Sequence, residues 1–139
     1  TQLNSHGVQT DLNLTEGLPQ VNGHPHQIEQ VLLNLLGNAR DALDERKGEG
    51  EKRVRIQTQQ ENGQVVLEVA DNGIGMDEEA KARVFEPFFT TKEAERGTGL
   101  GLSISYAIVH NHGGTIGCES QEGEGTMFRV TLPVAEDQV

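Results

Sequence analysis

The spacing of apolar positions changes several times along this chain of 139 residues. Apolar and polar residues alternate over 8–14, which predicts a strand. A short piece around residues 20–22 is expected to pair nearby. From Pro25 the apolar side chains recur at steps of three and four, which predicts one helix with a single apolar face. These side chains are Ile28, Val31, Leu32, Leu35, Ala39, Ala42 and Leu43.

Strand-like alternation returns near Val54, after a charged segment that is expected to be a loop. The pair Asn62-Gly63 predicts a two-residue hairpin turn, and residues 65–70 form the returning strand. Both faces of this second strand are expected to be partly buried, because its apolar residues are nearly continuous.

The second half of the chain alternates between short elements and glycine-rich segments. Asp77 is expected to cap a short helix that ends near Val84. Residues 85–101 read as a long loop, and loops of that length are usually functional or disordered. Helical spacing then returns over 102–112 and is stopped by two glycines. Two more strands are predicted near 115–120 and 126–132.

This order of elements predicts an α/β two-layer sandwich. One mixed, mostly antiparallel sheet of about five strands would pack against three helices, with a long loop acting as a lid. The βαβαβ alternation of a doubly wound sheet is absent. The length suits a single domain over residues 1–139, and the initial Thr1 suggests a fragment of a longer protein.

Charge and composition narrow the function. Lys and Arg total 11 against 22 Asp and Glu, a formal charge of −11. Nucleic-acid binding is disfavoured, because it needs a basic surface, and an anionic ligand would need a metal ion and a few placed cations.

No run approaches the roughly 18 apolar residues of a membrane span. We expect a cytoplasmic fragment without direct membrane contact; its one cysteine fits a reducing compartment. A membrane anchor in a longer parent stays open.

Three segments could carry chemistry. On the first helix Gln30, Asn34, Asn38 and Asp41 share one side, where amide oxygens could bind a hard cation or simply form a solvated polar face. Asp71 leaves a strand just before Gly73 and Gly75, so it could accept from an amino group beside a flat ring, or only form a turn.

The third segment is the run Gly97-Thr98-Gly99-Leu100-Gly101, directly before a helix. Exposed N–H groups at such a helix start bind anions, and glycines let a phosphate approach them. The run lacks the spacing of a dinucleotide fingerprint and the ending of a P-loop. Lys92 and Arg96 in the preceding loop could supply local positive charge.

Taken in order, these segments resemble the catalytic domain of sensor histidine kinases, within the wider group that includes gyrase and heat-shock chaperone ATPases. Residues 30–42 are similar to the N box of that family, 71–76 to its first glycine box, 85–92 to its F box, 97–102 to its second glycine box, and Gly125-Thr126 to its closing motif. The form Phe-Phe-Thr-Thr-Lys is closest to nitrogen-regulation kinases.

The resemblance implies ATP and Mg²⁺ as cofactors. Asp71 would accept from the adenine amino group, Asn38 would bind Mg²⁺ with Asn34 beside it, and Arg40 or Lys92 would face the phosphates. Asn38, Lys92 and Arg40 are the implied catalytic residues. The implied cofactor-binding set is Asn34, Asn38, Asp41, Asp71, Gly73, Gly75, Met76, Phe85, Phe89, Lys92, Gly97, Thr98, Gly99, Leu100, Gly101, Leu102 and Thr126.

The resemblance also implies an acceptor outside the fragment. Asn34 stands where hydrolytic relatives have a Glu that activates water, so little hydrolysis is expected. None of the five histidines has the sequence context of a phosphoacceptor. The implied partners are the dimerisation and phosphoacceptor helices of the parent and, downstream, a response-regulator receiver domain. Autophosphorylation of the fragment is not expected.

Three other readings stay open at this stage. The chain could be a serine-type protein kinase of the same fold, or a nucleotide-gated interaction module without transfer chemistry. It could also be an unrelated α/β domain whose glycines only form turns.

Overall fold

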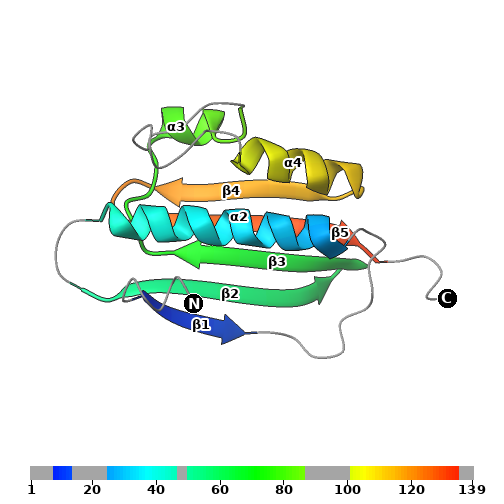
Figure 1. The fold of residues 1–139 in the computed structure, drawn as a ribbon, viewed down its shortest axis with the longest axis horizontal. Coiled ribbons are helices and arrows are strands. Elements are labelled where there is room, and N and C mark those ends of the chain that lie inside the picture. The colour runs from blue at the N-terminus through cyan, green and yellow to red at the C-terminus, as the bar shows by residue number, and fades with distance from the viewer. Residues whose placement is uncertain (1–7, 14–24, 47–49, 87–100, 135–139) are drawn as a thin grey trace.

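A mixed sheet of five strands forms the base of the molecule, in the order β1-β2-β3-β5-β4 (Figure 1). Its strands are β1 (Val8–Asn13), β2 (Lys52–Glu61), β3 (Gln64–Asp71), β4 (Thr115–Gln121) and β5 (Gly125–Pro133). β1 runs parallel to β2, and every other neighbouring pair is antiparallel. The predicted mixed, mostly antiparallel sheet is confirmed.

This computed structural model describes residues 8–13, 25–46, 50–86 and 101–134. Several predictions made from the sequence lie outside the described residues. They concern the pairing of residues 20–22, the lid, and the site residues Phe89, Lys92, Gly97, Thr98, Gly99 and Leu100.

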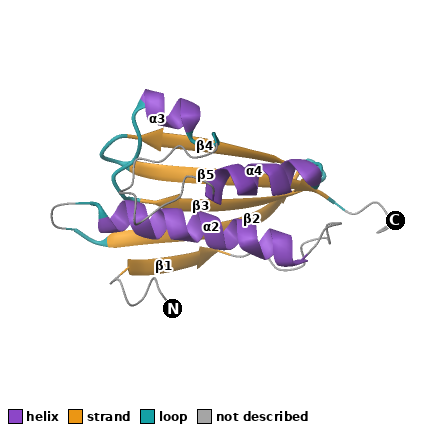
Figure 2. Cartoon of the chain, turned by 45° about the horizontal axis from the view of Figure 1, so that its top comes forward, coloured by secondary structure: helices purple, strands orange, loops and turns teal. Residues whose placement is uncertain are grey.

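The helices α2 (Pro25–Asp44) and α4 (Gly101–Asn111) lie side by side on one face of the sheet (Figures 1 and 2). The core is formed between this helix layer and the sheet. It includes Val31, Leu35, Ala39 and Leu43 from α2, Ile108 and Val109 from α4, and Val54, Ile56, Val69, Phe128, Val130 and Leu132 from the strands. The predicted apolar face of the first helix therefore covers the sheet. Within the described part of the chain, no helix is long and apolar enough to cross a membrane.

Local sequence signals end these elements where they were expected to end. Asn62 and Gly63 both have positive φ, 52° and 74°, as a tight hairpin turn between right-twisted strands requires. Asp77 caps the short helix α3 (Glu78–Arg83), because its carboxylate accepts from the Ala80 N–H at 2.8 Å.

Strand alternation decides which residues of the sheet face the helices. Val69 of β3 and Phe128 of β5 are cross-strand partners, and both belong to the core under the helices. Two residues further along the strands, Asp71 and Thr126 are also partners, so they face the same side. The sheet thus directs one carboxyl and one hydroxyl group toward the helix layer at the end of β3.

Candidate functional site

The carboxyl group of Asp71, at the C-terminal end of β3, is the first candidate for binding a ligand. Its Oδ1 accepts a hydrogen bond from the Gly73 N–H at 2.8 Å. Burial raises the pKa of Asp71 to about 6, although the N–H groups of Gly73 and Thr126 act in the opposite direction by stabilising the charge. A carboxylate has more acceptor positions than these two N–H groups use, so Asp71 can also accept a hydrogen bond from a ligand donor.

Glycines give the segment after Asp71 its close approach to neighbouring elements. A Cβ on Gly73 would lie 2.7 Å from the carbonyl carbon of Ala42 on α2, which no real side chain tolerates. Gly75 has φ of +69°, and its Cβ would lie 2.1 Å from the carbonyl oxygen of Gln121. The loop is thus held between the end of α2 and the β4–β5 hairpin, too closely for a side chain at either glycine.

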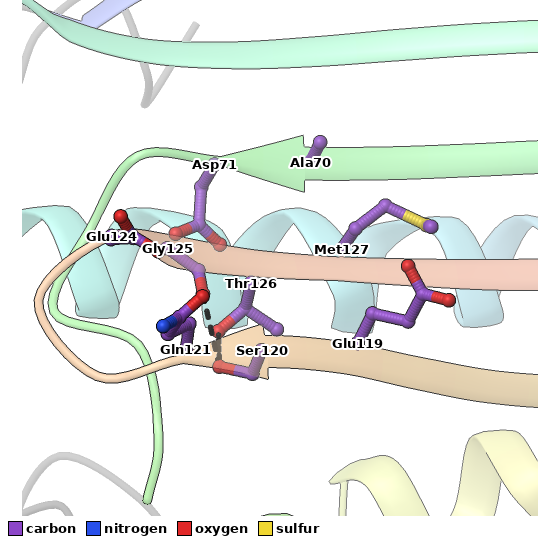
Figure 3. A pocket seen from close by; sticks show the side chains of 9 residues that line it. All are labelled: Ala70, Asp71, Glu119, Ser120, Gln121, Glu124, Gly125, Thr126 and Met127. Carbon is purple, nitrogen blue, oxygen red and sulfur yellow. Dashed lines mark hydrogen bonds between the residues drawn. The ribbon is translucent and has the colours of Figure 1, made fainter.

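A network of hydroxyl groups joins this loop to the two strands. Ser120 Oγ accepts from the Met76 N–H at 2.8 Å, donates to the Gly125 carbonyl oxygen at 3.0 Å, and lies 2.8 Å from Thr126 Oγ1 (Figure 3). Thr126 was expected at the site, whereas Ser120 was missed. The signal that could have found it is a hydroxyl in the same helix-facing row of β4 as Ile116 and Cys118.

A pocket of about 330 Å³ also lies at this end of the sheet (Figure 3). Its lining residues are Ala70, Asp71, Glu119, Ser120, Gln121, Glu124, Gly125, Thr126 and Met127. Ala70 and Met127 are cross-strand partners, and Glu119 pairs with Met127, so all three point away from the helices. Asp71, Ser120 and Thr126 of the same lining lie in the helix-facing rows, so the pocket lies at the end of the sheet where residues of both faces meet.

The second cluster lies where α2 meets the start of α4. The side-chain nitrogen of Asn34 donates to the carbonyl oxygen of Gly101 and to Ser105 Oγ, both at 3.1 Å. A backbone carbonyl can only accept, so these contacts fix which end of the amide is nitrogen. The oxygen of Asn34 is consequently directed away from that carbonyl, and it stays a candidate for binding a cation.

The other polar residues on this side of α2, Gln30, Asn38 and Asp41, differ in their exposure and in their hydrogen-bond partners. Gln30 is exposed, as a solvated face would require, but Asp41 is buried. Asp41 Oδ1 accepts from both Nε and Nη2 of Arg40 at 3.3 Å. Asn38 donates back to the Asn34 carbonyl oxygen at 3.1 Å. This side of α2 is thus more than a solvated surface, and Arg40, expected at the phosphates, is paired with Asp41.

Three other predicted site residues pack against the core. Met76, Phe85 and Leu102 are partly buried hydrophobic residues at its margin. The Phe85 ring lies 5.5 Å from that of Tyr106 on α4 and 6.2 Å from that of Phe128. Phe85, the first residue of the segment predicted to be the lid, thereby contacts both α4 and β5.

The helix α2 connects both clusters. Ala42 contacts the loop at Gly73, and Asn34, two turns earlier, contacts Gly101. Eight residues of helix separate these contacts by about 12 Å. Among the described residues, no group of three or more His, Cys, Asp or Glu is placed to hold a metal ion.

Comparison with known proteins agrees with this arrangement. Residues 23–136 match the family described as histidine kinase-, DNA gyrase B- and HSP90-like ATPases. The chain is 44% identical over 135 residues to the two-component sensor PprA of Pseudomonas aeruginosa, covering 96% of this chain and 14% of that protein. It is 42% identical over 136 residues to sporulation kinase E of Bacillus subtilis, covering 98% and 18%. The chain therefore spans less than a fifth of these relatives.

Solved structures show the same fold. The catalytic domain of the histidine kinase ThkA superposes with a TM-score of 0.79 at 33% identity, covering 96% of this chain and 84% of that one. Full-length ShkA in complex with AMPPNP gives 0.81 at 29% identity, covering 96% and 27%. The chain therefore belongs to the family of histidine kinase-, DNA gyrase B- and HSP90-like ATPases, among relatives that are sensor histidine kinases.

Proposed function

We propose that this chain is the ATP-binding catalytic domain of a sensor histidine kinase, with the adenine base held at Asp71. The observation that carries the proposal is the half-buried carboxylate of Asp71, which faces the helix layer and whose raised pKa of about 6 leaves it charged at neutral pH. The adenine amino group would donate to it. Gly73 and Thr126 would border the base, because the Gly73 N–H donates to that carboxylate and Thr126 is the cross-strand partner of Asp71. Gly75 would border it from the same loop.

The phosphates would extend along α2 toward Asn34 and the start of α4. Asn38 and Asn34 would hold Mg²⁺ through their amide oxygens, a donor set that suits a hard cation. The bound cation would neutralise the phosphate charge that this acidic chain otherwise repels. Arg40 would leave its ion pair with Asp41 to bind the phosphates. Lys92 and the run 97–102 would be the other residues that bind them.

Transfer would pass the γ-phosphoryl group to a histidine on another domain. Asn34 cannot take a proton from water, so bound ATP would be held and oriented with little hydrolysis. The partners would be the dimerisation and phosphoacceptor helices of the parent, with a receiver domain accepting the phosphoryl group next. Residues 1–139 would form one catalytic domain, which would act in the cytoplasm.

A reconstitution experiment tests the transfer. The chain is mixed with radiolabelled ATP, Mg²⁺ and a separately made acceptor-helix pair from a relative such as sporulation kinase E. Acid-labile, base-stable label on the helix pair, lost with Asn38→Ala, is the expected result. Label that resists acid on a serine of any protein substrate would instead identify a serine-type kinase.

The nucleotide-gated interaction module makes a different prediction. In that case ATP would change the affinity of the chain for its partner, and no label would move. Partner binding that kept its ATP dependence in a variant without transfer activity would favour the module over the kinase.

A further inference from the structure

We infer that Ser120 is a specificity-determining residue, which selects 6-amino over 6-oxo purine nucleotides by fixing the direction of the Thr126 hydroxyl. Ser120 would act through Thr126 without touching the base. The inference rests on the proposed function, because it concerns the same base-binding end of the sheet.

The hydrogen atoms available to these two hydroxyl groups admit one fully satisfied arrangement. Ser120 has one hydroxyl hydrogen, and the Gly125 carbonyl oxygen at 3.0 Å can only accept it. Thr126 must then donate across the 2.8 Å separation to Ser120 Oγ. Ser120 Oγ also accepts from the Met76 N–H at 2.8 Å, so both of its lone pairs are used. Reversing the Ser120–Thr126 bond would take the hydrogen away from Gly125.

This relay removes the only donor from the Thr126 side chain. Thr126 Oγ1 keeps lone pairs that can accept, and the neighbouring Asp71 carboxylate accepts as well. Two acceptors that both face position 6 of a purine suit the 6-amino group of adenine, which has two hydrogens to donate, or a water bound to it. They oppose the 6-oxo group of hypoxanthine or guanine, because acceptors facing each other leave buried polar groups unpaired.

The same hairpin provides a matched control. Thr115 and Thr131 form a hydroxyl pair between β4 and β5 at the far end of these strands from Ser120 and Thr126. That pair is exposed and distant from the Asp71 carboxylate. Removing its hydroxyl tests whether any lost cross-strand hydroxyl bond alters nucleotide preference.

The test compares binding of Mg-ATP and Mg-inosine triphosphate to the intact chain by calorimetry at pH 8, where the Asp71 carboxyl is ionised. Ser120→Ala frees the Thr126 hydroxyl to donate to an oxo group, so the preference for ATP should fall about tenfold. Ser120→Thr should retain the preference, and Thr115→Ala should leave it unchanged. A ratio of affinities is insensitive to a general loss of binding or folding.

A preference unchanged in Ser120→Ala would overturn the role of Ser120 while leaving ATP binding in place. Binding of neither nucleotide by the unaltered chain would overturn the proposed function itself, and the inference with it. Should Ser120→Ala fail to fold, Ser120→Cys must lower the preference in the same direction, because a thiol is a weak donor and acceptor.

Discussion

The side-chain amide of Asn34 on α2 donates a hydrogen bond of 3.1 Å to the hydroxyl of Ser105 on α4, whose side chain is completely buried. The same nitrogen donates to the Gly101 carbonyl oxygen at the first residue of α4. One amide therefore sets the position of the helix start that is proposed to face the phosphates, and it uses both of its hydrogens to do so.

Replacing Ser105 by Ala should weaken this connection. The half-buried Asn34 amide would lose one acceptor, so the free energy of unfolding should fall by about 1–2 kcal/mol in urea titrations. Asn111→Ala, at the exposed last residue of α4, should change it by less than about 0.5 kcal/mol. Equal stability of the Ser105 variant and the unaltered chain would show that the amide does not depend on that hydroxyl.

The two glycines with positive φ at 63 and 75 should respond differently to alanine. Both would strain the backbone, by about 1 kcal/mol, but only a Cβ on Gly75 meets another atom, the Gln121 carbonyl oxygen at 2.1 Å. Gly75→Ala should therefore cost at least about 2 kcal/mol more than Gly63→Ala and should also abolish nucleotide binding. Thermal unfolding of the pair decides this, and similar melting temperatures would contradict the close packing at Gly75.

The raised pKa of Asp71 predicts how stability without ligand depends on pH. The folded chain holds this proton up to about pH 6, whereas the unfolded chain releases it near the ordinary value of 3.8. Between these values the folded state binds more protons, so stability falls as pH rises, by up to about 3 kcal/mol in all. Asp71→Asn should lose this fall, and urea titrations from pH 4 to 7 would show it.

A matched carboxyl-to-amide change separates the effect of Asp71 on stability from the effect of exposed carboxyl groups. Asp11→Asn alters an exposed residue of β1 and should keep the fall in stability across the same pH range. If both variants and the unaltered chain gave parallel stability curves, burial of the Asp71 charge would not be the cause.

Nucleotide affinity should have the opposite dependence on pH. The proposal requires the charged form of Asp71, which is the stronger acceptor for the adenine amino group, so the affinity for Mg-ATP should decrease about tenfold for each pH unit below about 6. Titrations at pH 8, 7, 6 and 5 measure this. An affinity that is constant down to pH 5 would mean that a neutral Asp71 suffices.

The elements that carry long, regular patterns were predictable from the sequence. The seven apolar positions on α2, the turn at Asn62-Gly63 and the cap at Asp77 each depend on neighbours in the chain. The parallel pairing of β1 with β2 was not predictable in this way, because alternation identifies a strand without its partner.

The site was predictable only where a motif marked it. Asp71 and its glycines stand in one short segment, and the structure places Thr126 beside them as expected. Ser105 and Ser120 were missed, because their roles depend on contacts with residues 71 and 44 positions away in the chain. A serine at a core-facing position of α4, between Leu102 and Val109, was the signal available for the first of them.

Calorimetric titration of the chain with Mg-ATP, beside the Asp71→Asn variant, decides whether Asp71 holds the adenine base. The claim that Asp71 holds adenine predicts saturable one-to-one binding to the unaltered chain and a loss of at least about a hundredfold in the variant. Equal binding by both proteins, or none by the unaltered chain, would contradict it.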